Sequence, residues 1–468
     1  MTANRYVCAT GGTTDDNVGP PTFDPVVARA RHHSIPTRNE VHEVVNTGDT
    51  AWVLASAALV LLMTHGLALF YGGMVRVKSA LNMMMMSFGA LGLVSVLWVL
   101  FGYSVAFGDD VGGGLLGDPL QHLGLDSLLE DVTSESGGLP PMAFVGFQAA
   151  FAVLTVALVS GAVAERMRYG AWLAFAGVWA TLVYFPVAHW VFDFDADGHT
   201  GGWIANTLKA IDFAGGTAVH INAGAAALAL ALVLGVRRGF GTEIMRPHNL
   251  PLVMIGAGIL WFGWFGFNAG SALGANHTAS VAWVNTLVAP AAASLAWIAT
   301  EKIRDGFATS LGAASGMVAG LVAITPACAS VSPLGAILVG IGGGVLCSLA
   351  IGLKYTLGYD DSLDVVAVHL VGGLWGTLAI GLLATADAPT GVDGLLYGGG
   401  VDQLWRQAVG AVAVLVFSFV VTLVIAKVLD SVVGLRVEDD VEFAGLDARV
   451  HAEQGYDLAG MGGSSDPA

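Results

Sequence analysis

Long apolar segments recur along the whole chain, and they constrain its fold more than any other feature. A membrane-spanning helix needs about 20 mostly apolar residues. Eleven segments meet this length, namely residues 50–70, 84–107, 142–164, 170–192, 212–235, 250–270, 279–300, 308–327, 333–353, 361–384 and 405–428. Of the 468 residues, 12% are charged, whereas a soluble domain carries about 25%. The sequence therefore predicts an all-α polytopic membrane protein with 11 transmembrane helices, and it excludes a soluble enzyme, a nucleic-acid binder and a disulfide-stabilised secreted domain.

Lysine and arginine are distributed unequally over the loops. If the loop after the first segment is cytoplasmic, thirteen of the 19 basic residues lie inside, only Lys209 and Arg406 lie in or beside outer loops, and the remaining four lie in the N-terminal segment. The thirteen are Arg76, Lys78, Arg166, Arg168, Arg237, Arg238, Arg246, Lys302, Arg304, Lys354, Lys427, Arg436 and Arg449. Cytoplasmic loops carry an excess of Lys and Arg, so we expect the N-terminus outside and the C-terminus inside.

Ten of the segments divide into two sets of five, about 50–235 and 250–384, and the segment 405–428 is the eleventh. Five is an odd number, so the second set must cross the membrane in the opposite sense to the first. Such inverted repeats place a transport pathway at the interface of the two repeats. The sequence thus predicts two inverted five-helix repeats plus one further helix.

One pair of residues recurs in both repeats. Asp212 precedes His220 by eight residues, and Asp361 precedes His369 by eight. Eight helical residues rise about 12 Å, and the hydrocarbon core is about 30 Å thick. Counted from opposite faces of the membrane, the two histidines are therefore expected to meet near its midplane.

An ionisable residue inside a span is a functional candidate, because it is costly in lipid. One such histidine is more often a satisfied core residue, but two in matching places favour a functional pair. Neutral imidazoles can share a proton between ring nitrogens. Such a pair favours the passage of a small polar molecule or a proton and disfavours the passage of a bare cation. A metal site is the rival interpretation, but two histidines leave zinc short of ligands. Neither HExxH nor CxxC occurs, and the cysteines (Cys8, Cys328 and Cys347) indicate no metal or redox role.

Aromatic residues gather on two other segments. Trp264, Phe267 and Ser271 lie three to four residues apart, as do Phe147 and Phe151. Core packing is the ordinary explanation of such a stripe. The functional alternative is a cation site, because aromatic faces attract ammonium-like groups and a serine hydroxyl can accept their hydrogen bonds.

In these histidine and aromatic residues and in the segments around them, the chain resembles the ammonium transporter (Amt/Mep/Rh) family, prokaryotic Amt type. The resemblance covers roughly residues 50–460. The segments that carry the resemblance are FYGGMVR (70–76), FQAAFAVLTVALVSGAVAERMR (147–168), DFAGGTAVHINAG (212–224), WFGWFGFNAGS (261–271), TPACA (325–329), DDSLDVVAVH (360–369) and GLRVEDDVEFAGLDARVHAEQGY (434–456). The resemblance implies a homotrimer with one narrow pore in each subunit. It also implies no enzymatic activity and no cofactor.

The resemblance assigns roles to single residues. It makes Phe151 and Phe267 the stacked gate, Ser271 the serine of an outer recruitment site, and Asp212 the buried aspartate that supports this site. His220 and His369 match the twin histidines of the pore, and Trp264 matches a pore-lining tryptophan. Asp361 and Asp364 match acids at the cytoplasmic start of the tenth span.

The chain departs from the family pattern at the outer site. Phe192 stands where the family usually has the tryptophan of the cation–π wall, and a lengthened loop (193–211) follows. We expect a recruitment site rebuilt with Phe192, Trp190 or Trp203, or one that binds ammonium more weakly. A second departure is His65, where proline is common.

The terminal segments differ from the membrane domain, which we place at residues 47–430. Residues 1–46 are polar and lack the apolar region of a secretory signal peptide. They could be a disordered outer tail or a small capping segment, but we expect a start codon placed too far upstream, with initiation near Val41 to Val45. Residues 431–468 resemble the family's regulatory tail, which implies a PII-type signal protein as partner at the cytoplasmic face.

These observations together predict a multi-pass protein of the cell membrane that transports ammonium or ammonia. The alternative is an ammonium sensor of the same fold, which would signal through its tail and a PII-type partner. An intramembrane metalloenzyme would lack ligands and a nucleophile. An antiporter of another cation would need a carboxylate at mid-membrane, whereas Asp212 is placed at the outer entrance.

Overall fold

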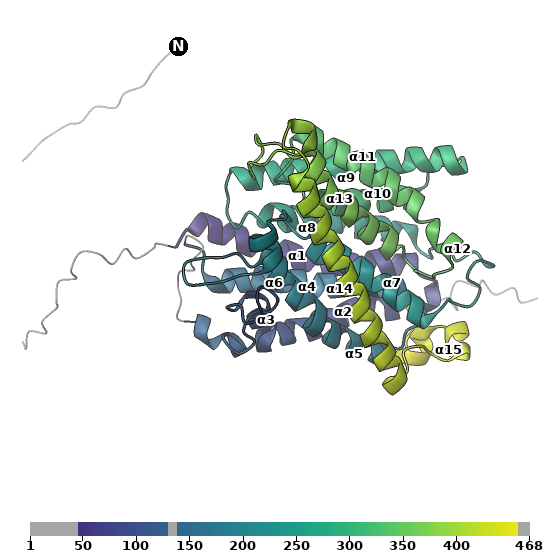
Figure 1. Ribbon diagram of the computed structural model, residues 1–468. Helices are drawn as coiled ribbons and strands as arrows, with labels where there is room; N and C mark the ends of the chain where they lie inside the picture. The colour runs from purple at the N-terminus through teal and green to yellow at the C-terminus, as the bar shows by residue number, and fades with distance from the viewer. Residues whose placement is uncertain (1–44, 130–137, 457–468) are drawn as a thin grey trace, which may run out of the picture. The chain divides into compact units, whose positions relative to one another are not determined.

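The computed structural model describes residues 45–129 and 138–456, and every named element within them is a helix. The main helices, labelled in Figure 1, are α1 (Thr47–Met74), α2 (Ala80–Leu97), α4 (Pro141–Val159), α5 (Tyr169–Trp179), α7 (Asn222–Leu234), α8 (Leu250–Gly270), α9 (His277–Asp305), α10 (Ser310–Ile324), α11 (Pro333–Ala350), α13 (Gly372–Leu383) and α14 (Asp402–Val433). The short helices are α3 (Tyr103–Phe107), α6 (Phe185–Phe192), α12 (Leu353–Leu357) and α15 (Asp439–Ala444). The predictions for residues 1–44 lie outside the described residues.

Four of the helical spans contain a wide π-helical turn. The turns are η2 (Trp98–Gly102) between α2 and α3, η5 (Ala180–Tyr184) between α5 and α6, η7 (Gly216–Ile221) before α7, and η8 (Val366–Val371) before α13. Such turns are rare and are frequent at functional sites. Two of them, η7 and η8, hold the two histidines that the sequence singles out.

Ten helices in the described part of the chain are long and apolar enough to cross a membrane, which confirms the predicted all-helical membrane protein. The predicted segment 308–327 is also helical, but α10 has only 15 residues. At 1.5 Å per residue it rises about 22 Å, less than the hydrocarbon thickness of about 30 Å. The regular pattern of α-helical hydrogen bonds ends there because Pro326 has no N–H group to donate. Hydrogen-bonded turns continue from Ile324 to Ser330.

Small residues allow the helices to approach closely, as is usual where helices pack in a membrane. α1 packs on α8, and α9 packs on α11. A Cβ atom at Gly256 of α8 would lie 2.4 Å from the backbone nitrogen of Phe70, and one at Gly344 of α11 would lie 2.3 Å from the carbonyl oxygen of Ala293. Neither position has room for a side chain.

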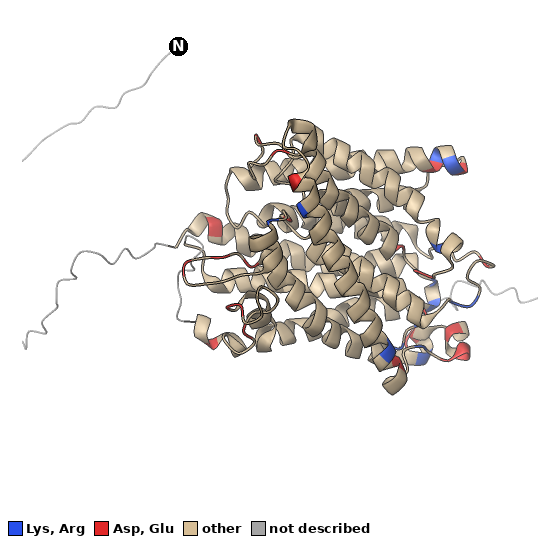
Figure 2. Cartoon of the chain, viewed as in Figure 1, with Lys and Arg blue, Asp and Glu red and all other residues tan. Residues whose placement is uncertain are grey.

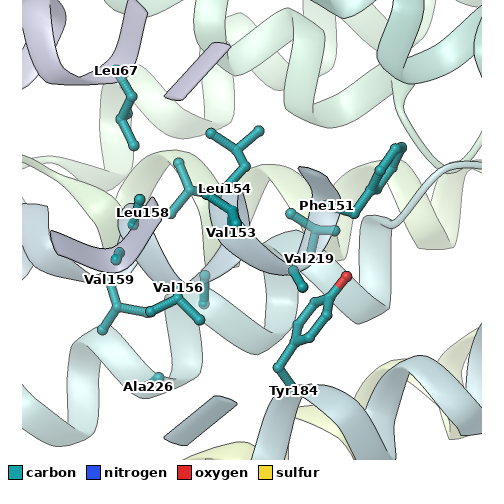
Figure 3. Packing of buried hydrophobic residues seen from close by; sticks show 14 of the residues in the cluster. Leu67, Phe151, Val153, Leu154, Val156, Leu158, Val159, Tyr184, Val219 and Ala226 are labelled. Carbon is teal, nitrogen blue, oxygen red and sulfur yellow. The ribbon is translucent and has the colours of Figure 1, made fainter. Parts of the chain in front are cut away.

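The interior is apolar, and the charges lie at the helix ends. Figure 3 shows Leu154, Leu158 and Val159 of α4 packed between Leu67 of α1 and Ala226 of α7. Figure 2 shows that the middle of the helices is almost free of charged residues, and that most basic residues gather at the end that carries α12 and α15. The buried polar and charged side chains are therefore the candidates for function.

Candidate functional site

A cavity of about 1100 Å³ lies at the end of the structure formed by α3, α6 and the loops beside them. Its deep wall includes Phe147, Gln148 and Phe151 from α4, together with Phe192 and Ser271. Its charged lining residues are Asp109, Asp193, Asp195, His199, Lys209, Asp212, Asp402 and Arg406. Aromatic faces attract small cations, and the rings of Phe147, Phe151 and Phe192 in this lining are together called the aromatic floor.

The outer-site candidates do not all face this cavity. Phe192 lines it, and its ring meets that of Phe151 edge-on at 6.5 Å. Trp190 is absent from the lining, and it packs instead against Trp203 (5.9 Å) and Phe417 (4.6 Å). Of the three alternatives for the aromatic wall, the structure therefore places only Phe192 in the cavity.

Ser271 ends α8 at the cavity. Its hydroxyl donates to the carbonyl oxygen of Phe267, 2.8 Å away, and the side chain is only partly buried. The proton of the hydroxyl is thus engaged within its own helix. Its lone pairs remain able to accept a hydrogen bond from a ligand in the cavity.

Asp212 caps the π-turn η7. Its carboxylate accepts hydrogen bonds from the backbone nitrogens of Gly215 (2.8 Å), Gly216 (2.6 Å) and Thr217 (2.7 Å), and from the hydroxyl of Thr217. Asp361 plays a matching part before η8, where one carboxylate oxygen accepts from the backbone nitrogen of Val366 at 2.6 Å. Both aspartates satisfy N–H groups that a helix start leaves without partners. Asp212 is therefore engaged with its own backbone rather than aimed at a ligand.

Two phenylalanines separate the cavity from the interior. The rings of Phe151 on α4 and Phe267 on α8 are stacked, with centroids 4.2 Å apart and planes inclined by 29°. Both side chains are almost fully buried. The ring of Phe267 also stacks on His220 at 6.1 Å. The phenylalanine pair thus lies between the cavity, which Phe151 lines, and His220, on which Phe267 stacks.

The two histidines meet beyond the phenylalanines. Nδ1 of His220 lies 3.2 Å from Nδ1 of His369, and the ring planes are inclined by 28°. A hydrogen bond between two such nitrogens requires one ring to donate and the other to accept, so the pair holds one shared proton between neutral rings. Among the described residues, no group forms a hydrogen bond with Nε2 of His220.

Trp264 fixes one side of this pair. Its ring stacks on His220 at 5.5 Å, and its indole nitrogen donates to the hydroxyl of Thr325 at 2.8 Å. Thr325 lies in the TPACA segment, and the sequence does not predict its hydrogen bond with Trp264. The only signal is that Thr325 directly precedes a proline, a residue that ends helices.

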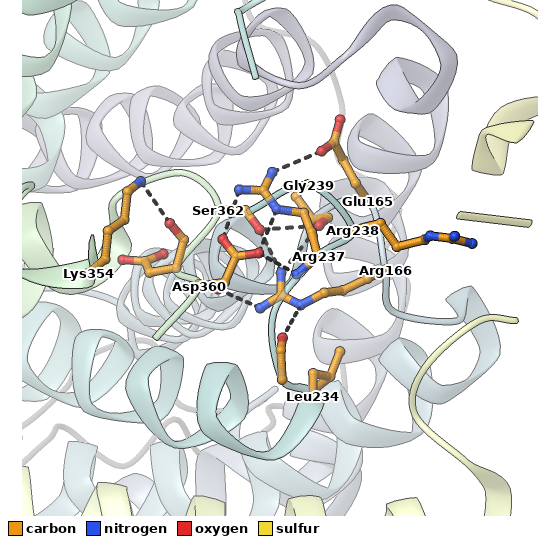
Figure 4. Close-up of polar contacts among 12 residues, drawn as sticks. Glu165, Arg166, Leu234, Arg237, Arg238, Gly239, Lys354, Asp360 and Ser362 are labelled. Atoms are coloured by element: carbon orange, nitrogen blue, oxygen red, sulfur yellow. Dashed lines mark hydrogen bonds and ion pairs between the residues drawn. The ribbon is translucent and has the colours of Figure 1, made fainter. Parts of the chain in front are cut away.

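A second cavity, of about 350 Å³, lies at the opposite end of the structure, and Arg76, Glu165, Arg237 and Ser362 line it. Figure 4 shows the polar network beside it. Arg237 contacts Glu165 at 2.9 Å and Asp360 at 2.8 Å, and these three side chains are buried.

The pKa values in this network follow from its geometry. Burial alone would raise the pKa of both carboxylates, but Arg237 and Arg76 lower the pKa of Glu165, and Arg237 and Arg166 lower that of Asp360. The network also includes a hydrogen bond from Arg166 to the hydroxyl of Ser362 at 2.7 Å. From the sequence, Arg166 and Arg237 are recognisable only as basic loop residues, because their partners are far away in the chain.

No three His, Cys, Asp or Glu side chains in residues 45–129 and 138–456 are grouped so that they could hold a metal ion. The buried histidine pair thus has no further ligand beside it within that part of the chain. The chemistry that the arrangement supports is hydrogen bonding and proton sharing at the end of an aromatic passage.

Comparison with known proteins agrees with this geometry. The model of the Ammonium Transporter Family matches residues 51–456. An ammonium transporter of Mycobacterium tuberculosis is 60% identical over 445 residues, covering 91% of this chain and 93% of the relative. The crystal structure of Saccharomyces cerevisiae Mep2 superposes with a TM-score of 0.78 at 32% identity, covering 86% of this chain and 92% of that one. A structure described as a sensor Amt protein gives a TM-score of 0.79 at 29% identity, covering 86% and 98%. These findings confirm the resemblance seen in the sequence: the chain is a multi-pass membrane protein and belongs to the ammonium transporter family.

Proposed function

We propose that this protein transports ammonium by binding NH4+ in the 1100 Å³ cavity and passing a deprotonated species between the phenylalanines to the histidine pair. Phe151, Phe192 and Ser271 form the recruitment site, and Phe151 and Phe267 form the gate. The single observation that carries the proposal is the sequence of contacts from the cavity through Phe151 and Phe267 to His220.

Desolvation explains the selectivity of this arrangement. An ammonium ion at the aromatic floor retains favourable interactions with ring faces. A potassium ion that entered the passage would lose its hydration shell without finding carbonyl oxygens in its place. Ammonium can instead transfer a proton to solvent water in the cavity and pass as a neutral molecule. The proton crosses by a separate route, so that one positive charge moves with each ammonia. The buried phenylalanine pair therefore selects against ions that cannot lose their charge.

The histidine pair then offers hydrogen bonds to the neutral molecule. Nδ1 of each ring is occupied by the other, which leaves Nε2 of His220 free of any described protein partner. In the tautomer in which His220 donates the shared proton, this Nε2 has a lone pair that accepts a hydrogen bond from ammonia; in the other tautomer it carries the N–H and donates to ammonia. Trp264 holds the ring of His220 in the orientation that keeps the pair intact.

The topology proposed for this transporter has 11 spans, an outer N-terminus and a cytoplasmic C-terminus. Support comes from the shared local architecture of the two repeats, in which an aspartate, a π-turn with histidine and an α-helix follow one another in both η7–α7 and η8–α13. The basic residues near α12 and α15 mark the cytoplasmic end under the positive-inside rule. In this arrangement α10, completed by the turns that follow Ile324, is the eighth of the eleven spans.

We also propose a homotrimer that a PII-type signal protein regulates at the cytoplasmic face. Exposed aromatic side chains, including Phe262 (59% exposed) and Trp283 (41%), provide apolar surface for a neighbouring subunit or for lipid. The tail after residue 430 returns to the membrane domain, where the carboxylate of Asp447 accepts hydrogen bonds from the backbone nitrogens of Leu81 (3.0 Å) and Asn82 (2.8 Å). A tail held in this way can report the binding of a partner to the membrane domain, which we place at residues 47–430.

Charge movement in proteoliposomes after an ammonium pulse tests the proposal. The wild type should give a sustained current selective over K+, and His220→Ala and His369→Ala should begin to pass K+. His65→Ala is the matched control, because His65 lies on α1 and contacts Phe88 rather than the pair. A pH change inside the vesicles without current would show conduction of neutral ammonia. Silence in both measurements would contradict transport and favour the sensor, whose fold the comparison with the sensor Amt protein also allows.

A further inference from the structure

Five titratable side chains form a continuous chain across the loops at the mouth of the large cavity. Nδ1 of His199 lies 2.7 Å from Asp109, and its Nε2 lies 2.9 Å from Asp193. The other oxygen of Asp193 lies 3.1 Å from Nδ1 of His189, whose Nε2 is 3.4 Å from Asp110. The chain thus joins the segment after α3, the end of α6 and the lengthened loop after it.

The hydrogen-bond inventory of His199 indicates its protonation state. A neutral imidazole has one N–H donor and one lone pair, whereas the imidazolium has two donors. Both nitrogens of His199 face carboxylate oxygens, which only accept. Burial alone would lower the pKa of His199, but the hydrogen bonds to Asp109 and Asp193 raise it above its ordinary value. The geometry favours the imidazolium form, and the raised pKa of His199 acts in the same direction.

Few other charges act on this ring. Asp109 faces it from the segment after α3, Asp193 from the end of α6, and His122 from the position just before η3 (Leu123–Leu128). His122 forms its own hydrogen bond with Ser127 at 2.9 Å and has no hydrogen bond with either of the two carboxylates. The remaining charged residues of the same cavity are Asp195, Lys209, Asp212, Asp402 and Arg406.

The contacts of His199 with Asp109 and Asp193, called the clamp below, lie next to a residue of the proposed ammonium site. Asp193 directly follows Phe192, and its carbonyl oxygen accepts hydrogen bonds from Gly202 (2.9 Å) and Asn206 (3.0 Å). The position of Asp193 therefore sets the position of Phe192, whose ring stands against Phe151 in the cavity. A shift of Asp193 would displace the backbone next to Phe192.

We infer that His199 is a positioning residue for the outer ammonium site: as an imidazolium it holds Asp193 and Asp109 together and thereby keeps Phe192 against Phe151. The inference rests on the proposed function. When the ring loses a proton, one of its nitrogens presents a lone pair to a carboxylate, and the clamp loosens. A group whose pKa is raised by folding holds its partners at lower pH and releases them as the pH rises through that pKa. The affinity for ammonium therefore falls as the outer pH rises.

The test is the KM for ammonium, expressed as NH4+ concentration, in proteoliposomes at outer pH from about 5.5 to about 8.5, the range in which histidine titrates. The wild type should show a KM that rises about two- to fivefold, the size of a weakened cation–π contact, with an unchanged maximal current. His199→Arg keeps a fixed charge and should retain the low KM throughout. His199→Gln should have the high KM throughout. His122→Gln, in the same cavity, should keep the rise.

A second readout does not depend on transport. The amide of Gly202, which donates to Asp193, should exchange hydrogen faster at high pH, after correction for the intrinsic rate, in the wild type but not in His199→Arg. A flat KM profile in a wild type that moves ammonium would overturn the role of His199 and leave the proposed function intact, as would a rise retained by His199→Gln. A wild type that moves no ammonium would overturn the proposed function and this inference with it.

Discussion

Replacing Arg237 by methionine removes the cation that lies between two buried carboxylates. The side chains of Arg237, Glu165 and Asp360 are 7%, 1% and 0% exposed. Removing one partner of a buried ion pair costs about 3–5 kcal/mol, because the other charge stays buried without compensation. We expect a loss near the lower limit, because Glu165 keeps its 2.9 Å contact with Arg76.

The assay is the unfolding midpoint of the detergent-solubilised protein, followed by tryptophan fluorescence. Arg237→Lys should lie between wild type and Arg237→Met, because lysine keeps the charge but cannot form the paired hydrogen bonds of the guanidinium group. Adding Asp360→Asn to Arg237→Met should recover part of the loss, since it removes one uncompensated charge and keeps an acceptor for the backbone nitrogen of residue 237.

The dependence on pH gives the sharper result. In the wild type, Arg237 and its neighbours lower the pKa of Glu165 and Asp360 against the effect of burial. Their stabilisation is therefore present above the ordinary carboxylate pKa of about 4, and it is lost only as the pH falls through the lowered values. Without Arg237, burial raises the pKa values of Glu165 and Asp360 relative to the wild type. Protonation of these carboxylates then removes the uncompensated buried charges of the variant. The loss of stability relative to the wild type should therefore shrink as the pH falls from about 7.5 to about 4.5. An equal deficit at both pH values, or a lysine variant as unstable as the methionine variant, would refute the reasoning.

Three further predictions concern packing, the outer site and the tail. Gly256→Ala should destabilise the protein by about 1–3 kcal/mol, because the new Cβ atom would meet the backbone of Phe70, whereas Gly258→Ala, where no atom lies within 4 Å, should leave the unfolding midpoint nearly unchanged. Phe192→Ala should raise the KM for ammonium about two- to fivefold by removing a ring from the cavity, and an unchanged KM would argue against Phe192 as the aromatic wall. Asp447→Ala should cost about 0.5–2 kcal/mol, the value of a helix cap, and should accelerate tryptic cleavage of the tail, measured by mass spectrometry. Equal cleavage rates would show that this contact does not hold the tail.

The sequence predicted the histidine pair for a reason that needs no tertiary model. His220 and His369 stand at the same distance from an aspartate in two apolar segments that are predicted to cross the membrane in opposite senses, so their expected depth in the membrane followed from helix geometry alone. Helix geometry alone could not decide whether Trp190 or Phe192 forms the aromatic wall of the outer site. Two residues on a helix differ by about 200°, so only one of them can face the cavity, but the sequence does not reveal which side of α6 faces inward.

The sequence by itself determined the class of protein, because long apolar segments with few charges have no stable alternative to helices in a membrane. It also determined the family, through motifs that stand in a fixed order. Only the tertiary structure decided which side chains meet across loops: the clamp of His199 with Asp109, 90 residues away in the chain, the network around Arg237 and the end of α10 after Ile324. Hydrogen bonds and ion pairs of this kind act over a few ångströms, so they depend on how the helices pack and leave no periodic signal along the chain.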